Sequence, residues 1–259
     1  MRPGIKVEAQ VIFVTGTDTG VGKTLLTGLL VHHLRLAGCH ALAMKPFCSG
    51  SREDVELLGA LQDSELSERE INPFYFRHAL APLVAARANR RSILMEDVLE
   101  RITAVTLRLL EGQTSNSKKY LLIEGAGGLL VPLGEKEMER RGSKRQGAMA
   151  GSAIYTLRDV ITRLDGAVIL VAPNRLGTIN HTMLTVVELQ RVGVKKLVIA
   201  LMNGKEPDNS ARTNPKMLAE LVTPIRVIPV PFFEKDPLKI GTLKKNAKKI
   251  KKTLARILA

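Results

Sequence analysis

The sequence predicts an α/β fold in which a parallel β-sheet is covered by helices on both faces. Apolar runs alternate with amphipathic stretches of helical length along the chain, and most of the runs are continuously apolar. Continuous runs are typical of strands that are buried on both faces, and alternating strands and helices favour a parallel sheet. A glycine-rich segment between the first run and the first amphipathic stretch adds a ligand-binding turn to this pattern.

Six apolar runs are predicted to form the strands: Val11–Thr15, His40–Lys45, Lys119–Glu124, Ala167–Ala172, Leu197–Met202 and Ile225–Pro229. Five amphipathic stretches are predicted to form the main helices: Lys23–Ala37, Ile93–Glu111, Leu157–Leu164, Ile179–Arg191 and Ser210–Leu221. Ser92 and Asn209 directly precede two of these helices, where a polar side chain caps free N–H groups, so both are predicted N-caps. The chain has no internal repeat and no linker rich in Pro, Gly or Ser, so we expect residues 1–259 to form one domain.

Two segments depart from this regular pattern. Residues 135–155, which include the basic run Arg140–Arg145, have no apolar period and predict an exposed, basic loop. Residues 238–259 predict a C-terminal helix with six lysines on one face, and its other face carries Leu243, Ala247, Ile250, Leu254 and Ile257. A packed helix with solvated lysines is the expected interpretation, and a surface for nucleic acid or acidic lipid is the alternative. Aromatic residues that stack on bases are nearly absent from both segments.

The composition limits the class of protein. Apolar residues make up 45% of the 259 residues but aromatic residues only 3%, so the core is expected to be aliphatic. The net charge of +14 suits nucleic acid, an acidic membrane surface or small anionic substrates as partners. The two cysteines do not form a disulfide pattern, which favours a reducing, cytoplasmic setting. We find no signal peptide and no apolar run near the roughly 20 residues of a membrane span.

The glycine-rich segment runs from Gly16 to Thr24 and has the features of a phosphate-binding loop. It follows a predicted strand and opens a predicted helix, so backbone N–H groups and the positive helix end face the same anion. Lys23 is expected to reach the outer phosphates, and Thr24 to offer its hydroxyl to a magnesium ion. Gly16 and Gly22 enclose five residues, one more than the usual spacing. The segment predicts a nucleotide site and a fold of the P-loop NTPase type.

Three further polar residues lie at or after predicted strand ends, where parallel sheets bind their ligands. Lys45 ends the second strand and precedes a loop with Pro and Gly, which favours an ammonium directed at an anion over a solvated charge. Asp54 fits either a metal ligand or a helix N-cap. Glu124 precedes the small residues Gly125–Gly128, which would let a metal approach closely; a solvated charge is the alternative. Together with Thr24, the two carboxylates offer the hard oxygen ligands that magnesium prefers.

These motifs together resemble the dethiobiotin synthetases, ATP-dependent carboxylases that close the ureido ring in biotin synthesis. The resemblance rests on GTDTGVGKT, KPFCSG, EGAGGLLVPL, the LGTINHT segment that begins at Leu176, and NPFY followed by APL. It covers about Val11 to Pro231 in order, with one interruption. The phosphate loop alone would not separate this family from its relatives.

The resemblance implies a reaction of 7,8-diaminononanoate, CO₂ and ATP, through a carbamate that ATP phosphorylates before the second amine closes the ring. It implies Lys23 and Lys45 as catalytic residues, Ser49 as a substrate contact, and Mg²⁺ held by Thr24, Asp54 and Glu124. The implied ATP-binding residues are Thr19, Gly20, Val21, Gly22, Lys23, Thr24, Asp54, Glu124, Gly125, Ala126, Gly127, Asn203, Pro229, Val230 and Pro231. The implied site for the substrate carboxylate is the helix start formed by Gly177, Thr178, Ile179 and Asn180, contributed by the partner subunit of a homodimer.

Three features differ from the family pattern: Gly20 stands where some members carry Glu, Arg175 precedes the helix start, and the 135–155 loop is longer and more basic. The main alternative is a partition or septum-site type ATPase that acts on DNA or membranes. Those ATPases carry a second lysine five residues before the main one, and here that position is Asp18. A non-enzymatic nucleotide-binding module is also possible, but it would not need Lys45, Ser49 and Glu124 at strand ends. We therefore expect small-molecule substrates and neither nucleic acid nor membrane as a partner.

Overall fold

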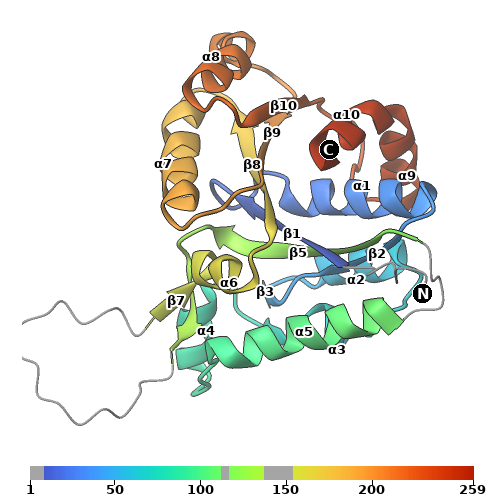
Figure 1. The fold of residues 1–259 in the computed structure, drawn as a ribbon, viewed down its shortest axis with the longest axis vertical. Helices are drawn as coiled ribbons and strands as arrows, with labels where there is room; N and C mark the ends of the chain where they lie inside the picture. Colours follow the sequence, from blue (N-terminus) through green and yellow to red (C-terminus); the bar gives the residue numbers. More distant parts are fainter. Residues whose placement is uncertain (1–8, 112–116, 137–153) are drawn as a thin grey trace, which may run out of the picture.

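A six-stranded, entirely parallel sheet forms the centre of the molecule (Figure 1). The computed structural model describes residues 9–111, 117–136 and 154–259. In spatial order the strands are β10 (Arg226–Val230), β9 (Leu197–Asn203), β8 (Ala167–Asn174), β1 (Ala9–Gly16), β5 (Lys119–Gly128) and β2 (His40–Met44). All six predicted strands are present, with ends shifted by a few residues, and the predicted fold class is confirmed.

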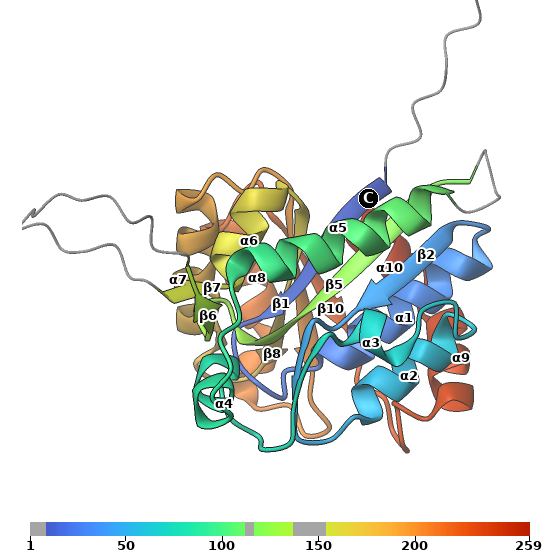
Figure 2. The ribbon, with the colours of Figure 1, turned by 90° about the horizontal axis from the view of Figure 1, so that it is seen from below.

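Helices cover both faces of this sheet. One layer contains α1 (Lys23–Leu36), α9 (Ile240–Lys249) and α10 (Lys251–Leu258), and the other contains α5 (Met95–Glu111), α6 (Leu157–Leu164), α7 (Thr178–Arg191) and α8 (Asn214–Leu221) (Figures 1 and 2). Helix α5 buries Val98, Ile102, Val105 and Leu109, which recur at helical spacing and face the sheet. The core between the layers is largely aliphatic, as the composition predicts.

Short elements lie between β2 and α5 in the chain, and the sequence indicated none of them except the helix that begins near Asp54. These are β3 (Phe47–Ser49), β4 (Phe74–Phe76), α2 (Glu53–Leu61), α3 (Glu68–Ile71) and α4 (Pro82–Ala88). Strands β3 and β4 pair in parallel, and the rings of Phe47 and Phe74 stack with centroids 5.1 Å apart. Three-residue strands have too short a pattern for periodicity to reveal them.

Both predicted N-caps are wrong. Helix α5 begins at Met95 rather than after Ser92, and the Asp97 carboxylate accepts the N–H of Leu94 at 3.1 Å. The hydroxyl of Ser92 instead donates to Glu135 at 3.3 Å. A 3₁₀ helix, η1 (Asn209–Arg212), precedes α8, and its cap is Asp208, which accepts two N–H groups. Asp208 is thus the N-cap of η1, whereas Asp97 lies within the first turn of α5 and accepts the N–H of the residue before the helix. In both places the acceptor is a carboxylate, which is a strong acceptor because it is charged.

The predicted exposed loop at 135–155 is wrong at its two ends. Strand β6 (Pro132–Glu135) pairs antiparallel with β7 (Ile154–Thr156), and the side chain of Tyr155 is fully buried. Tyr155 lies close to the backbone of Gly134, where an added Cβ would be 2.6 Å from the ring. The same Cβ would be 2.2 Å from the carbonyl oxygen of Ile93. Most of this segment, residues 137–153 with the basic run Arg140–Arg145, lies outside the described residues.

The basic C-terminal segment forms two helices, α9 and α10, and not one. The helix breaks at Ile250, which has φ −105° and ψ 22°. The predicted apolar side of the segment is confirmed: Leu243, Ala247, Ile250, Leu254 and Ile257 are all buried. Lys244 is half-buried and the other six lysines of the segment are exposed. Among the described helices, none combines the length and apolar content that crossing a bilayer requires.

Candidate active site

The glycine loop between β1 and α1 has the conformation that the sequence predicts. Gly20 and Gly22 have φ of 66° and 100°, values that side chains disfavour, and α1 begins directly after Gly22. A Cβ on Gly16 would lie 2.7 Å from Val21 and 3.0 Å from the carbonyl oxygen of Asp18. The loop is therefore closed tightly enough that its backbone sets its shape, as in an anion-binding cradle.

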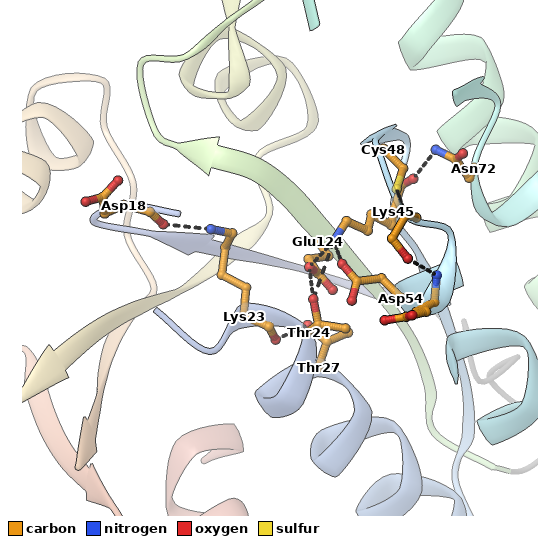
Figure 3. Close-up of polar contacts among 11 residues, drawn as sticks. Asp18, Lys23, Thr24, Thr27, Lys45, Cys48, Asp54, Asn72 and Glu124 are labelled. Carbon is orange, nitrogen blue, oxygen red and sulfur yellow. Dashed lines mark hydrogen bonds and ion pairs between the residues drawn. The ribbon is translucent and has the colours of Figure 1, made fainter. Parts of the chain in front are cut away.

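Lys23 is folded back onto this loop. Its ammonium donates to the carbonyl oxygen of Asp18 at 2.8 Å, and the residue is only 7% exposed (Figure 3). Burial lowers the pKa of Lys23, the positive charge of Lys45 adds to this effect, and the Glu124 carboxylate opposes it. Among the described residues no carboxylate contacts Lys23 directly, and a buried cation of this kind favours the arrival of an anion such as phosphate.

A second cluster joins four side chains from three elements and the turn after β2 (Figure 3). Glu124 of β5 accepts from the Thr24 hydroxyl at 2.7 Å and from the Lys45 ammonium at 2.9 Å, both on Oε1. The ammonium also forms an ion pair with Asp54 of α2 and lies 3.4 Å from the Thr24 hydroxyl. Thr24, Lys45, Asp54 and Glu124 are thus brought together as the sequence predicts. Asp54 lies inside the first turn of α2, so the N-cap alternative is wrong.

Charge holds Lys45 in its protonated form. Burial lowers its pKa, but the carboxylates of Glu124 and Asp54 outweigh burial and raise the pKa above its usual value. The Glu124 side chain is fully buried, and its second oxygen, Oε2, has no hydrogen-bond partner among the described residues. One face of the carboxylate therefore retains an unused acceptor.

The backbone around this cluster is held by Asn72, for which the sequence gave no role, and depends on two glycines. Asn72 donates to the carbonyl oxygens of Lys45 at 2.9 Å and of Pro46 at 3.1 Å, so it fixes the turn that carries the lysine. Asn72 belongs to the NPFY motif, and that motif was the available signal. A Cβ on Gly125 would lie 2.3 Å from Leu157, and Gly127 has a φ of 68°, so neither position accommodates a side chain without strain.

A cleft of about 510 Å³ opens in front of these residues. It is lined by most of the predicted site residues, namely Thr19, Gly20, Gly22, Lys23, Thr24, Lys45, Ser49, Asp54, Glu124, Gly125, Ala126 and Gly127. Pro237 and Leu238, which follow β10, also line it and were not predicted. Val21 does not line the cleft, because its side chain is buried under the loop.

The oxygen ligands of the cluster fit a magnesium ion. A hydroxyl and two carboxylates are hard donors, and a cation, the Lys45 ammonium, already lies among them. Oε2 of Glu124 has no partner in the part of the chain that the structure describes. Within the described ranges no three His, Cys, Asp or Glu side chains form a metal-binding group. Magnesium bound here would therefore depend on Thr24 and on oxygens of a nucleotide or water, which matches its preference for few protein ligands.

The predicted base contacts lie beside the cleft and not in its lining. Asn203 ends β9, and its neighbour Met202 would lie 3.2 Å from a Cβ on Gly22 of the phosphate loop. In β10, Val230 is fully buried, backbone included, so it does not face a ligand. Pro229 and Pro231, on either side of it, are exposed. Proline is tolerated at Pro229 because β10 is an edge strand.

The start of α7 is also outside the cleft: none of Gly177, Thr178, Ile179 and Asn180 lines it. Gly177 precedes the helix with a φ of 89°, and Asn180 is exposed. The Thr178 hydroxyl is buried and has no partner among the described residues. The carboxylate of Asp208 accepts the N–H of Leu176 at 2.8 Å and fixes the turn before the helix. Within one chain, therefore, this helix end and Lys45 do not share a pocket.

Known proteins resemble this chain in sequence. The sequence matches a family described as an AAA domain over residues 10–145 and 150–231. The ATP-dependent dethiobiotin synthetase BioD of Bacillus subtilis (strain 168) is 37% identical over 216 residues, which are 81% of each chain. The chain belongs to the dethiobiotin synthetase family. The dethiobiotin synthetase of Anaeromyxobacter sp. (strain K) is 36% identical over 225 residues, covering 84% of this chain and 89% of its own.

Solved structures of more distant proteins share the fold. A ParA family ATPase from Chlorobium tepidum TLS covers 98% of this chain with a TM-score of 0.54 and 14% identity. A plasmid partition protein of Borrelia burgdorferi B31 bound to AMPPNP gives a TM-score of 0.56 at 10% identity. At such identities the likeness concerns the fold alone. The AAA domain match ends at residue 231, so α9 and α10 of this dethiobiotin synthetase family member lie outside it.

Proposed function

We propose that the protein closes the ureido ring of dethiobiotin from 7,8-diaminononanoate and CO₂ with consumption of ATP. The observation that carries this proposal is the Lys45–Glu124–Thr24–Asp54 cluster beside the phosphate loop, in a chain of the dethiobiotin synthetase family. A protein that only bound nucleotide would not need a second buried lysine among its metal ligands.

The chemistry consists mainly of positioning and neutralising charge. One amine of the substrate attacks CO₂ to form a carbamate, and a carbamate oxygen then takes the terminal phosphoryl group from ATP, releasing ADP. The second amine attacks the activated carbonyl carbon, and phosphate leaves as the ring closes. Lys23 and Lys45 stabilise the negative charge on the phosphoryl group and the carbamate. Ser49, at the end of β3 in the cleft, donates a hydrogen bond to the carbamate or substrate.

The nucleotide site consists of the phosphate loop, the segment after β5 and the ends of β9 and β10. Thr19 to Thr24 and Gly125 to Gly127 surround the phosphates, while Asn203 with the exposed Pro229 and Pro231 contacts the base. Thr24, Asp54 and Glu124 would hold Mg²⁺, which supplies positive charge to the phosphates when it is bound. The free thiols of Cys39 and Cys48 fit a reducing compartment, and we place the protein in the cytoplasm.

The substrate carboxylate is proposed to bind the start of α7 of the partner subunit in a homodimer. Gly177, Thr178, Ile179 and Asn180 form this helix end, whose free N–H groups suit a carboxylate. Five large apolar side chains on α7, α8 and the turn before α7 are exposed: Leu176, Leu184, Val187, Met217 and Leu221. Exposed apolar residues concentrated on neighbouring elements are typical of an interface, and a two-fold dimer would cover them.

A partition-type ATPase is the second candidate, because the lysines of α9 and α10 form a basic surface and the fold is shared with such proteins. ATP hydrolysis separates the two functions. We expect the rate to rise with the diamine and bicarbonate and to ignore duplex DNA and acidic vesicles. Stimulation by DNA or vesicles without stimulation by the diamine would overturn the synthetase proposal.

The same assay with four lysines replaced by Gln examines the basic surface itself. The replaced residues are Lys244, Lys245, Lys248 and Lys249. Their charges are peripheral, and exposed charges are screened beyond roughly 8 Å at physiological salt. Turnover of the diamine should stay within a few-fold of the parent. A larger loss would mean that these lysines contribute to the reaction.

A further inference from the structure

Three asparagine side chains form a network where β8 and β9 end. Asn174 and Asn203 are partners across the β8–β9 ladder, and Asn214 begins α8. Asn174 and Asn214 are 5% and 3% exposed, whereas Asn203 is half-buried. Nδ2 of Asn174 donates to Oδ1 of Asn203 at 2.8 Å, and Oδ1 of Asn174 accepts from Nδ2 of Asn214 at 3.1 Å. No hydrogen bond of Nδ2 of Asn203 is present among the described residues.

Two backbone carbonyls determine which way these amides face. The carbonyl oxygen of Ala211 can only accept, so the Asn174 atom 2.9 Å from it must be the amide nitrogen. That nitrogen also faces Asn203, so the Asn203 atom opposite must be the oxygen. The carbonyl oxygen of Arg175 fixes Asn214 in the same way, at 3.2 Å from Nδ2. Because backbone atoms anchor both ends, the amide of Asn203 has one allowed orientation.

We propose that Asn174 is a positioning residue that fixes the amide of Asn203 and thereby sets the preference for adenine over guanine. This rests on the proposed contact of Asn203 with the base. Adenine presents an amino donor beside a ring nitrogen, which matches the Oδ1 and Nδ2 of a fixed amide. On its Watson–Crick edge guanine presents an oxygen acceptor beside a ring N–H donor, the reverse of adenine, so an amide fixed for adenine is mismatched at both positions. An amide free to rotate could adapt to either edge and would discriminate less.

The test compares three substitutions in the full-length protein. Asn174→Leu keeps the approximate volume and removes the hydrogen bonds that orient Asn203, and Asn203→Ala removes the base contact. Asn89→Leu is the matched control, since Asn89 also donates from Nδ2 to a backbone carbonyl, that of Ala85 at 2.7 Å, but on α4. Dissociation constants are measured for ATP, GTP and inorganic tripolyphosphate, with thermal melting as a check of folding.

In the Asn174→Leu variant we expect the ratio of the GTP to the ATP dissociation constant to fall by about tenfold, the size of one hydrogen-bond preference. The dissociation constant for tripolyphosphate should not change in the Asn174→Leu variant. The Asn89→Leu control should keep the melting profile of the parent. If Asn174→Leu does not fold, Asn174→Asp keeps the shape, turns the donor into an acceptor and should lower the same ratio.

The inference would be overturned if the folded Asn174 variant kept the parent's ratio of GTP to ATP dissociation constants while Asn203→Ala lost the preference for ATP. The proposed base contact of Asn203 would then still stand. A parent without ATP preference, or an Asn203→Ala variant that keeps it, would instead contradict the base contact itself and the inference with it. Ring closure by the parent is measured separately, so a failure of the proposed reaction is distinguishable from both.

Discussion

The ammonium of Lys45 lies 2.9 Å from Oε1 of Glu124, and it also contacts Asp54 and the Thr24 hydroxyl. These are the three groups that the sequence predicts as magnesium ligands. The lysine therefore occupies the position of a cation among these oxygen atoms. Two cations cannot share such a position without strong repulsion, so we expect Lys45 to leave its partners when Mg²⁺ binds.

Lys45→Met should therefore strengthen metal binding in the absence of nucleotide. Removing the competing ammonium leaves Glu124 and Asp54 for the ion, and we expect affinity for Mn²⁺, used as a spectroscopic substitute for Mg²⁺, to rise by about tenfold. The measurement is electron paramagnetic resonance titration. Lys45→Arg, which keeps the positive charge, is the control and should retain the weak binding of the parent. Equal or weaker binding in the Met variant would show that Lys45 does not compete for the metal position.

Glu124→Gln and Asp54→Asn should differ in their effect on stability. Glu124 is fully buried, and its loss leaves Lys45 partly uncompensated in the interior, at a cost of about 3 kcal/mol in the free energy of unfolding. The Asp54 side chain is 32% exposed, so its loss should cost less than about 1 kcal/mol. Urea unfolding measures both. Both variants should require more magnesium for turnover, and an unchanged magnesium dependence in both would place the metal elsewhere.

Lys23→Met should abolish turnover but stabilise the fold. Burial lowers the pKa of Lys23, so the folded state binds the proton more weakly than the unfolded state. The resulting loss of folding stability is fully present below the pKa of Lys23 in the folded state. It disappears as the pH rises from that pKa to the pKa of the unfolded state. The gain in melting temperature should therefore be largest near about pH 7 and shrink toward about pH 10. A gain that grows with pH, or retained turnover at saturating ATP, would contradict this role for Lys23.

The parallel sheet could be predicted because its strands are continuous apolar runs of ordinary length, and β1, β5 and β8 are buried over most of their length. The short strands β3, β4, β6 and β7 could not, because their pairing depends on partners distant in sequence. Tyr155 illustrates the difference: it belongs to a segment with no apolar period, yet its ring is buried through contact with Gly134.

The sequence could predict the site residues that belong to a recognisable motif, as at Lys23, Lys45 and Glu124. The sequence could not predict residues that contact another site residue and do not line the cleft themselves. Nothing in the sequence indicates that Asn72 holds the carbonyl oxygen of Lys45, or that Asn174 lies opposite Asn203. Such contacts depend on the register of the strands and on turn geometry, which a single sequence does not reveal.

The proposed dimer predicts that two inactive variants complement each other. Asn180→Ala damages the start of α7, and Lys45→Ala damages the cleft. If the two belong to one shared site, a mixed dimer contains one intact site, and mixing the variants should restore up to about a quarter of parental turnover after random reassociation. Mass spectrometry verifies that mixed dimers form. If they form and no activity returns, the sites are not shared between subunits.

The most direct test of the account is the fate of the carbon atom of bicarbonate. The purified protein is incubated with 7,8-diaminononanoate, ATP, magnesium and ¹³C-labelled bicarbonate, and the products are analysed by mass spectrometry. We expect labelled dethiobiotin and ADP to appear in equal amounts, and neither to form with Lys23→Ala. ADP formation by the parent that does not depend on the diamine, with no labelled ring product, would contradict the account.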